Sequence, residues 1–305
     1  MAMSVYDYVR LAALIVIIIV LATQKVKTFI LADAVITLIS GAASVWGFSQ
    51  LTYESETTLT YDGLHVLLNQ SLISFIIMPA LFYMFFACSA KDDDAAQGLL
   101  ATRTFTIGLV IVIIVFNQWR NPRIFKDTHV SVRLSSTVLW FCLTAYALYR
   151  SGITPPRRGR VSPINLYIKI DIVIAALYGL FDLLFARFAG SLISARFDLL
   201  HEHLTTLEGA ANLSTAVLGV YVLGFRNIAE RKGYLCSRLT VLLLTSCCLA
   251  CGLYNKKLTL TGYDIGVFAL GLIPVIPAVT GLVLTGDKRI FTSSTSTGYN
   301  LRRRD

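Results

Sequence analysis

Long runs of apolar residues, separated by short polar segments, recur along the whole chain. Each run is close to the roughly 20 residues that an α-helix needs to cross a bilayer. The pattern predicts an all-α polytopic membrane protein with about nine transmembrane helices, at 6–23, 28–48, 66–88, 103–118, 133–150, 165–187, 205–225, 235–254 and 263–285. The composition agrees, because 55% of the residues are hydrophobic, only 15% are charged, and the mean hydropathy is +0.67.

The first apolar run has the length of a secretory signal peptide, but its flanking charges are reversed. Asp7 and Arg10 precede the apolar core, and Lys25 and Lys27 follow it. A signal peptide carries its basic residues before the core. We therefore expect an uncleaved anchor with its amino terminus on the extracytosolic side.

Lys and Arg are unevenly divided when successive loops are placed on alternate sides of the membrane. Two thirds of the 27 basic residues fall on the side that also receives the carboxy terminus. Basic loops resist translocation, so this side is predicted to be cytosolic, in a plasma membrane or a membrane of the secretory pathway. The net charge of +9 then reflects orientation and contact with the lipid bilayer, and no nucleic-acid partner is expected.

Similar landmarks recur in the same order in the two halves of the chain. An Asp and a Gly eight residues later mark the second and sixth spans, and an Arg opens the fourth and eighth. An Asn-x-Ser triplet lies early in the third and seventh spans. These landmarks are Asp33, Gly41, Asn69 and Arg103 in the first half, and Asp171, Gly179, Asn212 and Arg238 in the second. Their order predicts two parallel four-helix repeats, with the ninth helix as an addition.

The repeat predicts how the chain is divided. Residues 1–150 hold the first repeat and the start of the second, and 151–164 form a cytosolic linker that contains Pro and Arg. Residues 165–262 complete the second repeat, 263–285 form the ninth helix, and 286–305 form a basic cytosolic tail.

Charged side chains at membrane depth are costly and call for a partner or a function. Asp33 and Arg103 lie near the predicted cytosolic ends of their spans, as do Asp171 and Arg238. We expect one structural Asp–Arg ion pair in each repeat, joining its second helix to its fourth. The alternative is that both acids only meet interfacial water.

A second group of polar residues lies toward the opposite side of the membrane. It suggests an outward polar pocket, or polar contacts between helices, formed by Asp182, Glu208, Asn69, Asn212 and His203. Asp182 and Arg187 are equally explained as a local ion pair. Ser44 stands where the repeat would align Asp182, so a site is favoured in the second half. Glycosylation of Asn69 or Asn212 is less expected, since both lie close to the membrane.

Metal and cofactor chemistry receives little support. The histidines of His201-Glu202-His203 suggest metal ligands, with Asp198 or His65 as a further ligand. A spacing of two does not place both rings on one helix face, however, and a solvated loop explains them better. The six cysteines lie in or beside the spans, so no disulfide framework is expected. No motif of a hydrolase, metalloprotease, ATPase or nicotinamide enzyme is found, and neither a cofactor nor a catalytic residue is predicted.

Three functional hypotheses stay open. The favoured one is binding or transport of a small or lipid-like molecule between the two repeats. The first alternative is a non-catalytic membrane scaffold whose polar groups only hold helices together. The second is a membrane-embedded enzyme that modifies lipid, with Asp182, Glu208 or His203 as acid or base.

Overall fold

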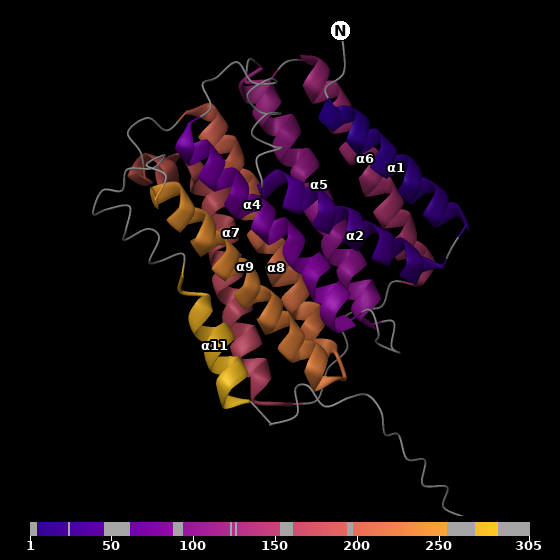
Figure 1. Cartoon of the computed structure of the whole chain (residues 1–305), viewed down its shortest axis with the longest axis vertical. Helices are drawn as coiled ribbons and strands as arrows, with labels where there is room; N and C mark the ends of the chain where they lie inside the picture. Colours follow the sequence, from indigo (N-terminus) through magenta and orange to yellow (C-terminus); the bar gives the residue numbers. More distant parts are fainter. Residues whose placement is uncertain are drawn as a thin grey trace, which may run out of the picture.

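The computed structural model describes residues 5–23, 25–45, 62–87, 94–122, 124–125, 127–152, 161–193, 198–254 and 272–285. Their regular secondary structure is helical, which confirms the predicted class (Figure 1). The helices are α1 (Val5–Thr23), α2 (Val26–Val45), α4 (Gly63–Phe82), the π-helix η1 (Tyr83–Ala87), α5 (Asp94–Arg120), α6 (Asp127–Ser151), α7 (Ile164–Ile193), α8 (Leu199–Gly224), α9 (Ile228–Tyr254) and α11 (Val275–Leu284).

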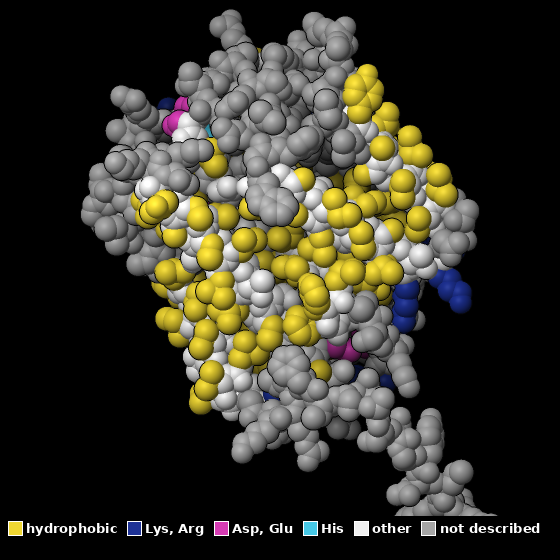
Figure 2. All heavy atoms as spheres, viewed as in Figure 1, with side chains coloured by type: hydrophobic (Ala, Val, Ile, Leu, Met, Phe, Trp, Pro, Cys, Tyr) yellow, Lys and Arg dark blue, Asp and Glu magenta, His cyan; other side chains and the backbone are white. Residues whose placement is uncertain are grey.

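Six of these helices are long and apolar enough to cross a membrane: α2, α4 with η1, α5, α6, α8 and α9. Apolar side chains form a broad band across the middle of the molecule, and charged ones lie near its edges (Figure 2). In a soluble protein such a band would be an exposed apolar surface far larger than usual. Lipid explains it, and the chain is therefore treated as membrane-embedded.

Several helices start earlier than the apolar runs predict. α5 begins at Asp94 rather than 103, α6 at Asp127 rather than 133, α8 at Leu199 rather than 205, and α9 at Ile228 rather than 235. Hydropathy detects only the apolar part of a helix. The same helix can continue through polar turns when the polar side chains of those turns form hydrogen bonds. Gln97, for example, donates from Nε2 to the carbonyl oxygen of Ser151 at 3.0 Å.

Part of the predicted organisation lies outside the described residues. The described helix α11 covers only the last part of the span predicted at 263–285. Most of the predicted linker at 151–164, and the tail at 286–305, also lie outside them.

Two helices form the centre of the bundle (Figure 1). α4 and α8 pack against each other, and they are the most buried of the six apolar helices. α4 also contacts α2 and α9, while α8 contacts α7 and α5. At the periphery, α6 packs on α5 and α1, and α11 packs on α9 and α7. The contacts in the two halves therefore match if the helices are paired in order: α2 with α7, α4 with α8, α5 with α9, and α6 with α11.

Two glycines let neighbouring helices approach closely. A Cβ atom on Gly179 of α7 would lie 2.8 Å from the carbonyl oxygen of Gly209 and 2.8 Å from the backbone nitrogen of Leu213, both on α8. A Cβ atom on Gly41 of α2 would instead meet the side chain of Ile77 on α4. α7 and α8 are thus in backbone contact beside the pocket described next.

Candidate functional site

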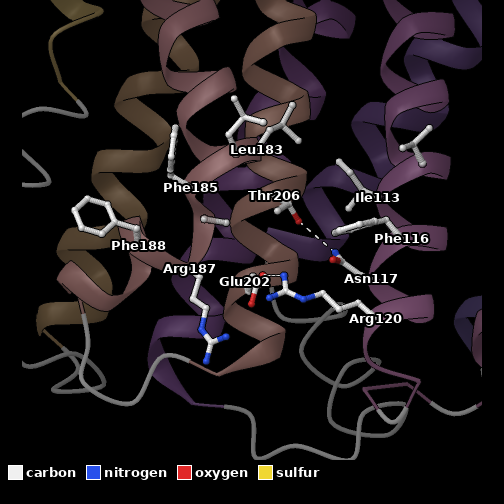
Figure 3. A pocket seen from close by; sticks show the side chains of 13 residues that line it. Ile113, Phe116, Asn117, Arg120, Leu183, Phe185, Arg187, Phe188, Glu202 and Thr206 are labelled. Atoms are coloured by element: carbon white, nitrogen blue, oxygen red, sulfur yellow. Dashed lines mark hydrogen bonds and ion pairs between the residues drawn. The ribbon is translucent and has the colours of Figure 1, made fainter.

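A pocket of about 810 Å³ lies between α5, α7 and α8 (Figure 3). Apolar side chains make most of its wall: Val112, Ile113 and Phe116 from α5, and Leu183, Leu184, Phe185, Ala186 and Phe188 from α7. α7 leaves helical geometry at Phe185, where φ is −126° and ψ is 23°. Because this kink lies in the wall, the backbone of α7 itself shapes the pocket.

Polar side chains gather at one end of the pocket, where α5 ends and α8 begins. Arg120 donates from Nη1 to Oε1 of Glu202 at 2.7 Å. Asn117 donates from Nδ2 to the Thr206 hydroxyl at 3.4 Å. Arg187 of α7 also lines the pocket, and Figure 3 shows its side chain near that same end. The pocket therefore combines a long apolar wall with a charged end.

The rim of the pocket faces the surroundings of the bundle rather than its core. Val112 is 62% exposed, Leu184 is 70% exposed and Phe188 is 57% exposed. These side chains belong to helix faces that an isolated soluble protein would bury. In a bilayer they would meet acyl chains, so the pocket is reachable from the lipid.

The starts of α4 and α8 are joined by a group of four residues, Asp62, His65, Asp198 and His201, which we call the clasp. Asp62 caps α4 by accepting the backbone N–H groups of Leu64 and His65, each at 3.0 Å. Asp198 caps α8 in the same way. In each capping box the histidine three residues later accepts the N–H of the cap residue at its Nδ1.

The two capping boxes of the clasp also bind each other. The rings of His65 and His201 stack with centroids 3.5 Å apart. Nε2 of His65 lies 3.1 Å from Oδ1 of Asp198, and Nε2 of His201 lies 3.2 Å from Oδ1 of Asp62. Since each Nδ1 accepts a backbone N–H, each Nε2 carries the proton and donates to the opposite aspartate. The clasp thus ties the two central helices together at one end.

The clasp has donor atoms that a metal ion could use, but they are already engaged. Ligand atoms of Asp62, His65 and His201 lie within 4.8 Å of one another. Both nitrogens of each ring, however, take part in the hydrogen bonds described above. Stacked rings also direct their nitrogen lone pairs along their own planes rather than toward a common point. The arrangement fits a hydrogen-bonded joint better than a metal centre.

Asp62 remains ionised in this setting. Partial burial raises the pKa of its carboxyl, but the backbone hydrogen bond from His65 and the nearby rings of His65 and His201 lower it more. The net result is a pKa below the ordinary value of 3.8. The cap on α4 is therefore a carboxylate at neutral pH.

The residues predicted as ion pairs are brought together in both halves. Nε of Arg103 lies 3.1 Å from Oδ2 of Asp33. Nε of Arg238 lies 3.2 Å from Oδ1 of Asp171, and both of these side chains are fully buried. Each aspartate also accepts an aromatic donor, Trp140 Nε1 at 2.9 Å for Asp33 and the Tyr234 hydroxyl at 2.7 Å for Asp171. The alternative, in which both acids only meet interfacial water, does not fit these contacts.

The five residues suggested as an outward polar pocket do not line the pocket found here. Glu208 accepts a hydrogen bond from Ser71 of α4 at 2.6 Å, and His203 lies 2.9 Å from the Asn117 amide. Asn69 and Asn212 are buried in their helices. Asp182 lies one position before the wall residue Leu183 and forms no ion pair with Arg187. Asp182 of α7 does lie beside Glu208 of α8, with which it interacts electrostatically, whereas the other three residues belong to α4 and α8.

Two sequence-based interpretations of these residues were wrong. His201 and His203 were expected in a solvated loop, but both lie on α8 and are 1% exposed, because Asp198 starts the helix before them. Asn212 was expected early in its span, as Asn69 is. It follows the cap Asp198 by fourteen residues, whereas Asn69 follows Asp62 by seven, so the two sequons do not correspond.

Residues 21–282 match a family described as a domain of unknown function, DUF8292. The chain belongs to this family. The matched segment includes the clasp, both Asp–Arg pairs and every residue of the pocket wall. No curated protein and no solved structure matches the chain.

Within this DUF8292 chain, sequence reasoning missed the contacts made by Asp62, Arg120 and Glu202. Asp62 and Asp198 share a D-x-L-H pattern, Asp62-Gly-Leu-His65 and Asp198-Leu-Leu-His201, at nearly the same place in each half. A search for repeated capping boxes would have found the clasp. Arg120 and Glu202 are 82 residues apart, and no local pattern indicates that they meet.

Proposed function

We propose that this protein is a multi-pass membrane protein that binds a small, lipid-like molecule in the pocket between α5, α7 and α8. The observation that carries the proposal is the combination of a mostly apolar wall with a polar end formed by Asn117, Arg120 and Glu202. Such a lining matches an elongated molecule with one apolar and one polar part.

The size and position of the pocket support this function. Ligand pockets typically measure roughly 300–1,000 Å³, and this one measures about 810 Å³. Its rim residues Val112 and Leu184 are largely exposed on the lipid-facing side of the bundle. A membrane-dissolved molecule therefore has a lateral route into the pocket and need not cross water.

We further infer that the chain contains an internal repeat and crosses the membrane nine times. Its amino terminus would be extracytosolic and its carboxy terminus cytosolic. The matched neighbours of the helices support a revised division, in which α2 to α6 form one unit and α7 to α11 the other. The matched caps of α4 and α8 and the two Asp–Arg pairs support the same pairing. In this scheme α1, rather than the ninth helix, is the addition.

The pocket then lies between the two units, since α5 belongs to the first and α7 and α8 to the second. An axis along the membrane normal, passing between α4 and α8, would relate the units. This placement agrees with the hypothesis of a ligand held between two repeats. The loops at the clasp end would face the extracytosolic side.

The lipid-modifying enzyme gains no comparable support. Its candidate acids and base were Asp182, Glu208 and His203, and none of them lines the pocket wall. A general acid or base has to reach the reacting atoms within hydrogen-bonding distance. A non-catalytic scaffold remains the principal alternative to ligand binding.

Purification in native lipid followed by mass identification of retained molecules tests the proposal. The full chain should retain an amphiphile, and Val112→Trp at the rim should reduce its occupancy. Val115→Trp is the matched control, because Val115 is also an exposed valine of α5 but does not line the pocket. Equal occupancy in the two variants, or no retained molecule, would favour the scaffold.

A further inference from the structure

The charged end of the pocket has an excess of positive charge. Its lining includes two guanidinium groups, Arg120 and Arg187, and one carboxylate, Glu202. The 2.7 Å contact between Arg120 and Glu202 balances one of the positive charges. Arg187 makes no ion pair with any described residue and is exposed. The charge at this end therefore complements an anion.

Arg120 is also held where it can assist in binding an anion. A guanidinium has five N–H donors, and the pair with Glu202 uses Nη1. Glu202 is 9% exposed, so its carboxylate fixes the arginine from the buried side. Figure 3 shows Arg120 and Arg187 entering this end from α5 and α7, on opposite sides of Glu202.

The apolar wall continues directly from these charges. Phe188 lies one residue after Arg187, and Phe116 lies one helical turn before Arg120. An arginine near a helix end can also extend toward water with no ligand at all. That simpler explanation accounts for the position of Arg187, but not for the mostly apolar pocket of about 810 Å³ that continues from it.

We infer that the ligand is an amphiphile with one anionic head group, of the carboxylate or phosphate class. Arg187 binds this head group, while the hydrocarbon chain of the ligand lies between α5 and α7. This inference rests on the proposed function and adds the charge of the ligand to it. Arg187 is the specificity-determining residue, and Arg120 is a second donor held in place by Glu202.

The test compares two probes that differ only in the head group, palmitate and hexadecanol. The full chain in nanodiscs of phosphatidylcholine would be titrated with each probe, and the rise in Tm measured. Palmitate should bind at least about tenfold more tightly than hexadecanol. Arg187→Gln should remove most of this preference, and Arg187→Lys should keep part of it because the charge is retained.

Arg226→Gln is the matched control, since Arg226 is an exposed arginine beyond the other end of α8. It should leave the preference for palmitate unchanged. Equal affinities for the two probes, or a preference that survives Arg187→Gln, would overturn the inference. If both probes bind and Val112→Trp weakens both, the pocket stands without its charge selectivity. If neither probe binds, both this inference and the proposed function fail.

Discussion

The rings of His65 and His201 stack 3.5 Å apart, and each donates to the aspartate that caps the other helix. Removing either ring should therefore weaken both capping boxes. We expect His65→Ala and His201→Ala each to lower the free energy of unfolding by about 1–3 kcal/mol, because buried hydrogen-bonding groups lose their partners.

A double-mutant cycle measures this coupling. The double variant should be less destabilised than the sum of the two single changes, by about 0.5–3 kcal/mol. The measurement is unfolding of the purified chain followed by circular dichroism. Simple additivity would show that the stacked rings do not act as one unit.

The clasp should also depend on pH through Asp62. Its pKa lies below 3.8, so its carboxylate stabilises the fold fully above that pH, and this contribution is lost as the pH falls through the lowered pKa. The difference in Tm between the wild type and Asp62→Asn should be largest near neutral pH and shrink below 3.8. Asp94→Asn, at the start of α5, controls for loss of an acid at a helix start. A difference that grows on acidification would contradict the assigned cap.

The two Asp–Arg pairs should differ in their importance. Arg238 and Asp171 are fully buried, whereas the Arg103 side chain is 19% exposed and also donates to Thr37 at 2.9 Å. Breaking a buried pair typically costs about 3–5 kcal/mol, since one charge is left uncompensated. Arg238→Gln should therefore destabilise the protein more than Arg103→Gln.

The double variant Asp171→Asn with Arg238→Gln supplies the second half of this test. It should be no less stable than the Arg238→Gln variant, because no unpaired charge remains. Thermal unfolding in a fixed detergent gives the ranking. If the double change costs the sum of the single changes, the two side chains do not form a pair in the membrane.

Gly179 should tolerate alanine less well than Gly41. The added methyl on Gly179 meets backbone atoms of Gly209 and Leu213, which cannot move aside, whereas on Gly41 it meets only side-chain atoms of Ile73 and Ile77. Forced separation of α7 from α8 should cost about 1–3 kcal/mol. It should also reduce ligand retention, because both helices line the pocket. Equal losses of stability for the two variants would argue against backbone contact at Gly179.

The two ends of α8 should lie on opposite sides of the membrane. Pro122 follows α5 at the clasp end, and Arg226 follows α8 at the other end; both are exposed. With the six native cysteines replaced, a cysteine at 122 should react with an impermeant reagent in intact cells. A cysteine at 226 should react only after permeabilisation. The reverse pattern would invert the orientation, and labelling of both from one side would exclude a spanning α8.

Apolar runs alone predicted the helical class and the approximate position of every described helix. They also pointed to both Asp–Arg pairs, since a charge inside an apolar run needs a partner and each half offered one of each sign. They failed at helix starts. Asp94 and Asp198 begin helices through polar turns that hydropathy does not detect.

The site depended on contacts that no local pattern encodes. Glu202 sits beside two histidines in the sequence, and that neighbourhood suggested metal or solvent rather than an arginine 82 residues earlier. The kink at Phe185 has no Pro or Gly next to it, so the sequence gives no sign of where α7 bends. The order of similar landmarks in the two halves was visible, but pairing Asn69 with Asn212 left the starts of α4 and α8 out of register.

The clasp also has a consequence for how the chain is made. His65 leaves the ribosome 133 residues before Asp198, and Asp62 leaves it 139 residues before His201. The first half of the chain must therefore enter the membrane with an incomplete clasp, in which His65 still lacks Asp198 and Asp62 still lacks His201. Translation of α8 completes it, so the central helices reach their final packing only once the second half is being inserted. A chain that ends before residue 198 should be recognised by cellular quality control, because Asp62 and His65 of the clasp stay exposed in it.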